Sequence, residues 1–510
     1  MRSPLKSRAI LAVALTRPAD AHGGFSVVPP AWPLAIVGVL GLQTILTLGH
    51  DAWLDEWQAI QLAYQSPDVA TLLQQLRYEG HPPLWYLLLR TVATITGPQD
   101  ALRVTALACA LATQAMILLR APFPRVVRVL LCLSEIILFE YNTIARGFTL
   151  GLTMTIATLA LWHRGRWAWW PIALLPAVDF LFGVFSLIFV AFRLIEGERN
   201  WTGVTFWLAL SVLSAIAIIP IPGMAVSLPP GPDLTMNAAT FLQKLSMVVF
   251  PLQWGSDGLA WNEGAPWGLH AYLWIGFFIL CREQTRGRRS DQLALFGFLS
   301  VQLAMSVWVY ALPIRHVMQV AILIIALQWR RSGSTPSGED AKLSPVFVAW
   351  ISSMATCGII TAGVALVRPF DAAPQVVEAI HRHGLVGENW AAEPAFAAAS
   401  ISALSGIKFD TLNHQCRQDF IRRDFASGIN DASGLIVALS SKLEREGRFY
   451  LLSTRELHLG ELALQVEAIP AGFNGYGYRI YEVGAGMGVR PYNLPRCVPG
   501  MRDFPPANLN

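Results

Sequence analysis

Five carboxylates gather in residues 50–83 of this 510-residue chain, with Arg77 as the single Arg or Lys among them. An apolar run, residues 31–48, precedes this stretch, and a mostly apolar run, residues 84–95, follows it. Because charge close to a bilayer is costly, acidic groups there usually mark a site or a hydrated loop. A positioned carboxylate is also suited to take a proton from an attacking hydroxyl. The carboxylates are Asp51, Asp55, Glu56, Asp68 and Glu79.

The stretch is expected to contain two short helices. Trp57, Ile60 and Tyr64 have the spacing of one apolar helix face. Pro67 is suited to the first position of the next helix, whose apolar face lies in residues 69–76. Both helices are too short and too polar to span a membrane, so we expect them to lie along its surface.

The composition predicts a polytopic membrane protein. Hydrophobic residues make up 54% of the chain and charged residues 14%, against about 25% charged residues in soluble domains. The 18 tryptophans fit belts at the membrane interfaces. The net charge of +4 is small, so we expect no nucleic-acid partner. Residues 1–30 are basic with a very short apolar run, which predicts a cytoplasmic tail rather than a cleaved signal peptide.

Basic clusters between the apolar segments predict the orientation, since cytoplasmic loops are rich in Arg and Lys. Residues 31–368 then form the membrane domain, and residues 369–510 an extracytoplasmic domain. Residues 50–83, 140–142, 220–266 and 312–316 fall outside. Further spans are expected at residues 123–139, 144–162, 201–220, 267–281, 293–311, 317–329 and 344–367. The clusters are Arg120/Arg125/Arg128, Arg164/Arg166, Arg282/Arg286/Arg288/Arg289 and Arg330/Arg331.

This orientation requires two incomplete crossings. Residues 84–97 and 101–119 cannot both be full spans, so the shorter segment, residues 84–97, is predicted to be re-entrant or half-inserted. Residues 167–193 begin and end inside but are too long for one straight span of about 20 residues. We therefore predict two half-spans that meet near Asp179. Broken helices are tolerated in a membrane where they line a polar cavity.

The first loop resembles that of the GT-C glycosyltransferases, most nearly the protein O-mannosyltransferases and the lipid A aminoarabinose transferases. The motifs are Asp55-Glu56 after a first span, two surface helices, and His81-Pro82-Pro83 before an aromatic-rich helix. The resemblance covers residues 31–330. It implies a GT-C-like α-helical membrane protein with about 11–13 membrane helices, some broken or re-entrant. It also implies a bacterial inner membrane location with the catalytic face extracytoplasmic.

The resemblance implies that Asp55 is the general base that deprotonates an acceptor hydroxyl. The alternative is that Asp55 only caps its helix, as Asp often does. Glu56 is a second catalytic candidate, with a surface or metal-ligand position equally open. Asp51 is expected to be a solvated loop residue.

Basic and polar groups at the outer ends of spans are the candidate substrate-binding residues. Arg146 can grip a phosphate with its forked donors, or it can extend to the interface as long cationic side chains do. The same pair of readings applies to Arg315. His81 is a candidate hydrogen-bond donor to phosphate, with an interfacial ring as the alternative. Asp179 is a candidate contact to the acceptor or to a metal ion, with a helix cap as the alternative. Beside these residues we assign Glu140, Tyr141 and His316 to the same site.

The long outer loop combines aromatic and acidic residues that suit sugar stacking and hydroxyl binding, although interfacial Trp is the commoner explanation. These residues are Trp254, Asp257, Trp261 and Glu263. No cofactor is required by the motifs, and a divalent metal ion is left open. A two-Asp metal arrangement is in doubt because Arg146 stands where the aminoarabinose transferases carry an Asp.

Residues 369–510 predict a small α/β domain. Apolar runs of strand length occur at residues 434–439, 449–452, 462–469 and 476–483, after helical patterns at residues 374–383 and 394–404. Cys416 and Cys497 are its only cysteines, and a disulfide between them is plausible in an oxidising compartment. The other four cysteines, Cys109, Cys132, Cys281 and Cys357, are expected to be small core residues.

The resemblance implies transfer of a sugar from a polyprenyl-phosphate donor to a lipid, glycan or protein acceptor. A transporter or flippase is the rival class, because broken helices and intramembrane charges also occur in carriers. The third class is an envelope protein that uses its outer domain as a binding module. Transfer from, or hydrolysis of, a lipid-phosphate sugar by purified protein would separate them.

Overall fold

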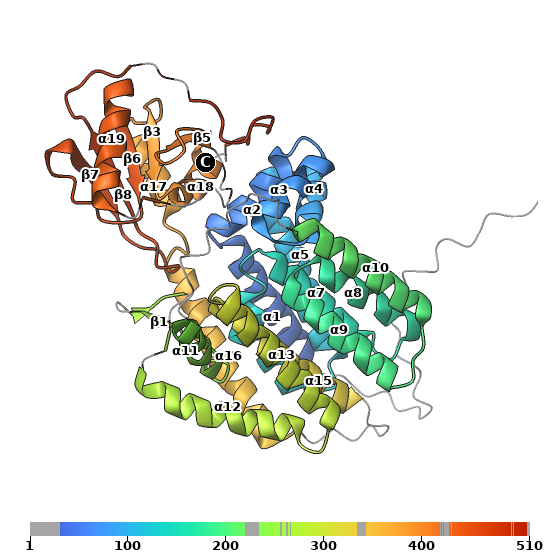
Figure 1. Ribbon diagram of the computed structural model, residues 1–510. Helices are drawn as coiled ribbons and strands as arrows, with labels where there is room; N and C mark the ends of the chain where they lie inside the picture. Colours follow the sequence, from blue (N-terminus) through green and yellow to red (C-terminus); the bar gives the residue numbers. More distant parts are fainter. Residues whose placement is uncertain are drawn as a thin grey trace, which may run out of the picture.

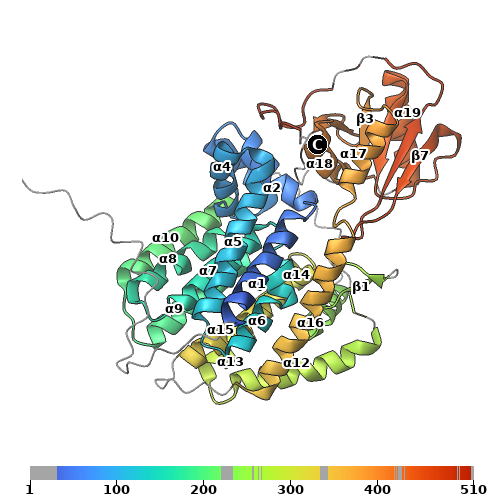
Figure 2. The ribbon, with the colours of Figure 1, turned by 180° about the vertical axis from the view of Figure 1, so that it is seen from behind.

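The computed structural model describes residues 31–219, 234–255, 258–261, 264–265, 267–333, 343–418, 420, 422, 428–429, 431–490, 492 and 494–506. The described residues between 31 and 368 form a helical bundle, and the described residues after them form a domain with a β-sheet at one end of that bundle (Figure 1). Residues 1–30, predicted to be a basic tail, lie outside the described residues. Viewed from behind, the sheet domain again meets the bundle at the α2–α4 end (Figure 2).

The bundle is built from helices of very different lengths. Four of the described helices, α1, α5, α10 and α16, are long and apolar enough to cross a membrane by length and composition. The bounds are α1 Ala31–Leu48, α2 Leu54–Gln65, α3 Val69–Glu79, α4 Leu84–Thr96, α5 Pro98–Arg120, α6 Arg125–Cys132, η2 Ile136–Glu140, α7 Gly147–Ala160, η3 Gly165–Ala168, α8 Trp169–Leu174, η4 Leu175–Ala177, α9 Phe180–Ile195, α10 Trp201–Ile218, α11 Leu234–Ser246, η5 Trp267–Leu269, α12 His270–Thr285, α13 Arg289–Trp308, α14 Ile314–Val317, α15 Gln319–Gly333 and α16 Pro345–Val367.

The two predicted short helices are α2 and α3, and α4 packs against α2 and α5 beside them. One detail of the prediction was wrong: α3 begins at Val69 and its N-cap is Asp68, whose carboxylate accepts from the Thr71 amide at 2.7 Å. Pro67 therefore precedes the cap. With 13 residues, α4 is about 20 Å long, which is shorter than the bilayer core. Its length fits the predicted incomplete crossing.

The predicted break near Asp179 is present. Residues 165–195 form η3, α8, η4 and α9, and Asp179 caps α9 by accepting from the Leu181 amide at 3.0 Å. The two ends of this segment meet, because Arg193 Nη2 donates to the Gly165 carbonyl at 3.0 Å. The segment is therefore a hairpin whose tip carries Asp179.

A second break was not predicted. Residues 123–139 were expected to form one span, but α6 ends at Cys132 and the chain continues as the π-helix η2. Gly358 of α16 explains the interruption, since a Cβ there would lie 2.1 Å from the Leu133 carbonyl oxygen. The close approach of α16 occupies the place where an unbroken helix would run. The long outer loop also holds an unpredicted helix, α11, which packs on α13 and α12.

The C-terminal domain has a six-stranded sheet in the order β5-β4-β3-β6-β8-β7. The pairs β3–β4 and β3–β6 are parallel, and the remaining pairs are antiparallel. The bounds are α17 Ala373–Arg382, β3 Trp390–Glu393, η6 Ala395–Ala398, α18 Ala399–Ser405, β4 Phe409–Thr411, β5 Arg417–Gln418, α19 Ala432–Glu446, β6 Phe449–Ser453, η8 Gly460–Leu462, β7 Ala463–Ile469 and β8 Tyr478–Val483. A two-stranded sheet in the outer loop joins β1 Trp254–Gly255 and β2 Gly258–Leu259.

The domain is α/β as predicted, but the strand expected at residues 434–439 is part of α19. Asp431 caps that helix at the Gly434 amide. Leu435 and Leu439 lie one turn apart and are buried with Lys442 on one face. The short run is thus one segment of a longer amphipathic helix. The predicted disulfide between Cys416 and Cys497 is present, with the two Cα atoms 4.9 Å apart.

Candidate active site

Asp55 lies on the first turn of α2 between two arginines. Its Oδ2 atom is 2.7 Å from Nη1 of Arg146 and 3.3 Å from Nη2 of Arg315. The three side chains are 22%, 12% and 11% exposed, so these ion pairs are partly shielded from water. The N-cap of α2 is Trp53 rather than Asp55. The capping alternative for Asp55 therefore does not describe this fold.

Glu56 performs the capping function. Its carboxylate is fully buried and accepts from the Trp53 amide at 3.0 Å and from His50 Nε2 at 2.8 Å. The other carboxylate oxygen accepts from the Ala145 amide at 2.5 Å. Glu56 thus holds the start of α2 against the start of α7. It was predicted as a catalytic candidate, but these contacts give it a positioning function.

A small cavity, of about 30 Å³, opens beside Asp55. It collects four of the predicted site residues from four separate elements, and its remaining walls are mostly aromatic or apolar. Charged and polar groups therefore converge on a largely apolar space, which is typical of a binding site. The cavity is lined by Asp55, Ala59, His81, Trp85, Tyr86, Arg146, Gly147, Phe148, Val178 and Asp179.

Arg146 reaches this cavity from the N-cap position of α7. The next residue, Gly147, lies against the hairpin tip, since a Cβ built on it would be 3.4 Å from the Val178 carbonyl oxygen. This close approach brings the tip of the α8–α9 hairpin to the start of α7. The broken hairpin predicted from the sequence therefore supplies one wall of the cavity, including Asp179.

Arg315 approaches Asp55 from α14, behind the cavity wall. Its guanidinium lies over the rings of Trp53 and Trp261, at 5.7 Å and 5.5 Å from their centroids. The Tyr141 hydroxyl donates to the Arg315 carbonyl oxygen and fixes the backbone there. The Nε and Nη1 atoms of Arg315 are buried and have no hydrogen-bond partner among the described residues. Arg315 therefore keeps donor capacity for an anion.

The other two predicted residues support this arrangement from outside the cavity. Glu140 accepts from Trp261 Nε1 at 2.7 Å and so fixes one of the rings under Arg315. His316 is buried, with Nε2 3.1 Å from the Tyr310 hydroxyl and its ring edge-on to Phe148 at 4.9 Å. Neither side chain lines the cavity.

Two solved structures are similar to this chain, both crystal structures of ArnT from Cupriavidus metallidurans. The apo structure is 12% identical with a TM-score of 0.49, covering 89% of this chain and 98% of that one. The structure bound to undecaprenyl phosphate is 11% identical with a TM-score of 0.43, covering 90% and 99%. ArnT is a lipid A aminoarabinose transferase, one of the families that residues 50–83 resemble. No family model and no curated protein matches the chain. The chemistry is therefore argued from the site residues themselves.

Sequence reasoning missed one cation of this region. Lys244 lies on the unpredicted helix α11, and its Nζ atom donates to the Leu312 carbonyl at 2.8 Å. It is close enough to Arg315 and His316 to act on both electrostatically. The apolar positions of α11 would have been the available signal, because Phe241 and Leu245 lie one turn apart and are buried.

The outer-loop residues have separate outcomes. Trp261 is buried and belongs to the site through Glu140 and Arg315. Trp254 is 49% exposed on β1 and lines no part of the cavity. Asp257 and Glu263 lie outside the described residues. Asp51 lies in a loop as expected but is half-buried, and burial raises the pKa of its carboxyl against the opposing effect of His50.

The donor groups around Asp55 do not resemble a metal centre. Among the described residues, no three His, Cys, Asp or Glu side chains are grouped so as to hold an ion. The Oδ2 atom of Asp55 is already shared by two guanidinium groups, which would repel a cation. The residues present suit an anion better than a divalent metal.

Proposed function

We propose that this chain is an integral-membrane glycosyltransferase that moves a sugar from a polyprenyl-phosphate-linked donor to an acceptor at the extracytoplasmic face. One observation carries the proposal: Arg146 and Arg315 converge on a single carboxylate, Asp55, at the rim of a cavity. The loop motif of residues 50–83 gives the reaction class by its resemblance to the GT-C glycosyltransferases. Undecaprenyl phosphate is the ligand of one of the ArnT structures, but the proposal rests on the motif and on this geometry.

The two arginines are assigned to the donor phosphate. Arginine offers a planar fork of N–H donors that matches phosphate oxygens, and such charged hydrogen bonds are roughly twice as strong as neutral ones. A phosphate entering the cavity would accept from the same groups that now hold Asp55. His81, which also lines the cavity, is assigned as a further hydrogen-bond donor to the phosphate. Charge that develops on the leaving phosphate is thereby stabilised in a site whose donors are already oriented.

Asp55 is assigned as the general base. When phosphate oxygens take over the arginine donors, the Asp55 carboxylate is left beside the cavity with a lone pair for the acceptor hydroxyl. The hydroxyl oxygen attacks the anomeric carbon, its proton passes to Asp55, and the bond from that carbon to the phosphate oxygen breaks with its electron pair. Attack opposite to the leaving phosphate inverts the anomeric centre. Asp179, at the far side of the cavity, is assigned to acceptor contact.

No step of this mechanism is routed through a metal ion. We assign the orientation from the basic loops, several of which lie together: Arg330 of α15 pairs with Glu196 after α9 at 3.0 Å, and Arg193 bonds Gly165. With those loops in the cytoplasm, the cavity and the sheet domain are extracytoplasmic.

The test is transfer from a defined polyprenyl-phosphate sugar by purified protein in detergent or liposomes. We expect free polyprenyl phosphate to be released in proportion to the protein, with inversion at the anomeric carbon of the product. A transporter or flippase would instead move the intact donor across a liposome membrane. Translocation of intact donor without release of polyprenyl phosphate, tested with a mixed set of acceptors, would contradict the proposal and favour the transporter.

A further inference from the structure

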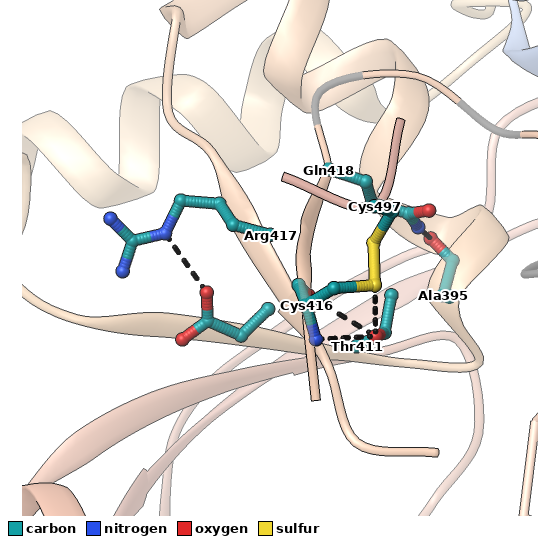
Figure 3. Close-up of a disulfide and its surroundings, with 7 residues drawn as sticks. Ala395, Thr411, Cys416, Arg417, Gln418 and Cys497 are labelled. Carbon is teal, nitrogen blue, oxygen red and sulfur yellow. Dashed lines mark hydrogen bonds and ion pairs between the residues drawn. A yellow bond between two sulfur atoms is a disulfide. The ribbon is translucent and has the colours of Figure 1, made fainter. Parts of the chain in front are cut away.

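The last described segment of the chain, residues 494–506, runs from the sheet domain to helix α2; we name it the C-terminal strap. At the sheet end it is held covalently by the Cys416–Cys497 disulfide (Figure 3). It is also held by the backbone of Arg417, whose amide donates to the Pro495 carbonyl at 2.8 Å and whose carbonyl accepts from the Cys497 amide at 3.0 Å. The strap therefore starts from a fixed point beside β5.

At its other end the strap is bonded to the last turn of α2. The Arg502 amide donates to the Gln65 carbonyl at 2.8 Å, and Gln65 Nε2 donates to the Arg502 carbonyl at 3.1 Å. The Arg502 guanidinium donates to the Pro67 carbonyl, just beyond α2, at 2.8 Å. Gln65 and Arg502 are 437 positions apart in the sequence. These bonds tie the end of the chain to the helix that carries Asp55.

An aromatic contact accompanies the bonds. Phe504 is 8% exposed, and its ring meets Tyr64 and Trp57 edge-on at centroid distances of 5.8 Å and 6.4 Å. Beyond it, Gln99 Nε2 on the first turn of α5 donates to the Pro505 carbonyl at 2.5 Å. The strap thus crosses α2 and ends on α5. Tyr64 and Trp57 lie on the same apolar face of α2 that the strap covers.

The two ends of α2 are held by different parts of the molecule. At the first turn, Glu56 bonds the Ala145 amide and Asp55 pairs with Arg146. At the last turn, Arg90 of α4 donates to the Ala63 carbonyl at 2.8 Å and to the Ser66 carbonyl at 2.6 Å, and the strap adds its own bonds. With 12 residues, α2 is about 18 Å long, so a tilt at the last turn moves the first turn as well.

We infer that the C-terminal strap is a positioning element for the catalytic helix, and that the Cys416–Cys497 disulfide maintains its grip. Phe504 and Arg502 are the positioning residues, acting on Asp55 through α2. The catalytic role of Asp55 rests on the proposed function, whereas the contact between the strap and α2 does not. A displacement of about 1 Å at a reacting group can lower a rate by about 100-fold. The sheet domain thereby contributes to turnover without contacting the cavity.

The grip on α2 is tested first by hydrogen exchange of the full-length protein, which needs no substrate. Phe504→Ala is compared with Tyr492→Ala, an aromatic truncation in the preceding tail where Arg445 lies over the ring at 5.5 Å. We expect amides of residues 54–65 to exchange about tenfold faster in Phe504→Ala only, because local opening becomes easier. Equal exchange of these amides in both variants and the wild type would overturn the inference.

The effect on turnover is tested second. We expect Phe504→Ala to lower kcat about 10–100-fold with little change in KM, and Phe504→Tyr to retain most of the activity. A covalent replacement of the grip, Gln65→Cys with Arg502→Cys, should restore kcat to Phe504→Ala when oxidised, whereas Phe504→Ala without these two cysteines should not recover under the same oxidation. Unchanged kcat in Phe504→Ala, or no recovery on oxidation, would contradict the positioning function. If the wild type shows no transfer, the proposed function fails. The hydrogen-exchange data alone then decide whether the strap holds α2.

Discussion

Two arginine–carboxylate clusters lie at opposite ends of α7, and they differ in how completely their charges are used. At its start, Arg146 and Arg315 share one oxygen of Asp55 beside a cavity. Beyond its last residue, Trp162 Nε1 donates to Glu196 at 2.8 Å. Glu196 belongs to the second cluster. The 14 residues of α7 separate the two clusters by about 21 Å.

The second cluster balances three arginines with three carboxylates. Arg330 bonds Glu196 and Asp291, Arg331 lies 3.5 Å from Asp291, and Arg193 bonds Glu198. Its arginines also donate to backbone carbonyls, including that of Trp162. Such a network fixes helix ends against one another. The first cluster has two arginines for one carboxylate, whereas the second has three arginines for three carboxylates. The unbalanced positive charge, rather than the presence of arginine, therefore distinguishes the binding site from the structural network.

The largest effect should follow from Asp55→Asn. The amide cannot accept the hydroxyl proton, and loss of general-base catalysis typically lowers the rate about 10²–10⁴-fold. The protein should stay folded, since Trp53 rather than Asp55 caps α2. Single-turnover transfer from a polyprenyl-phosphate sugar measures the effect. Wild-type rates would move the base elsewhere, with Asp179 the next residue to test.

The second cluster gives the matched control, Asp291→Asn. Asp291 is fully buried, and neutralising it removes the negative charge that Arg330 and Arg331 share. Breaking a buried pair in this way costs about 3–5 kcal/mol of stability. Thermal unfolding in detergent should show a lower midpoint, while kcat of the protein that remains folded stays at the wild-type level. A selective loss of kcat would erase the distinction between the clusters.

Asp371 is a buried carboxyl that, unlike Asp55 and Asp291, has no arginine partner among the described residues. Asp371 accepts from the Ala373 amide, the Ser400 hydroxyl and the Tyr478 hydroxyl, and burial raises its pKa from 3.8 to about 6. Between these values the folded protein keeps a proton that the unfolded chain has lost, so stability falls as pH rises. The loss is about 3 kcal/mol at 1.36 kcal/mol per pKa unit.

We therefore expect the wild-type unfolding midpoint to drop between about pH 4 and pH 6 relative to Asp371→Asn, whose side chain does not titrate. The two proteins should be compared at each pH, because other groups add a common background. An identical pH dependence in both would show that Asp371 stays ionised when buried.

The smallest effect is expected for Arg146→Ala. A hydrogen bond to a charged group contributes about 1.5–3 kcal/mol, so donor affinity should weaken by about 10–100-fold. Unlike the base, a phosphate contact exists in both the ground and transition states, so KM rises together with any loss of kcat. Arg146→Lys should recover part of the affinity, because lysine keeps the positive charge but lacks the paired N–H donors of the guanidinium. An unchanged KM in Arg146→Ala would remove this residue from the phosphate site.

The sequence predicted those parts of the site that depend on local patterns. The two short helices followed from apolar spacing, and the break at Asp179 followed from segment length and the basic loops. Arg146 and Arg315 were recognised as cations at the outer ends of spans. The motif could not show that both would meet Asp55, since residues 55 and 315 are brought together only by packing of α2 against the rest of the bundle.

The errors have local causes as well. Residues 434–439 have strand length and β-branched side chains, and only the cap at Asp431 and the buried Lys442 reveal the helix. Glu56 looked catalytic because it adjoins Asp55, yet its partner is the Ala145 amide in a distant segment. The strap could not be predicted, because its contacts join positions 437 residues apart and follow no periodic pattern.

The central claim is that one set of arginines serves both Asp55 and the donor phosphate. The most direct measurement is the affinity of purified wild type, Asp55→Asn and Arg146→Ala for a polyprenyl phosphate in nanodiscs. If Asp55 competes with phosphate for the same guanidinium groups, Asp55→Asn should bind at least as tightly as the wild type while its transfer rate collapses, and Arg146→Ala should bind more weakly. Weaker binding by Asp55→Asn, or wild-type binding by Arg146→Ala, would contradict the account.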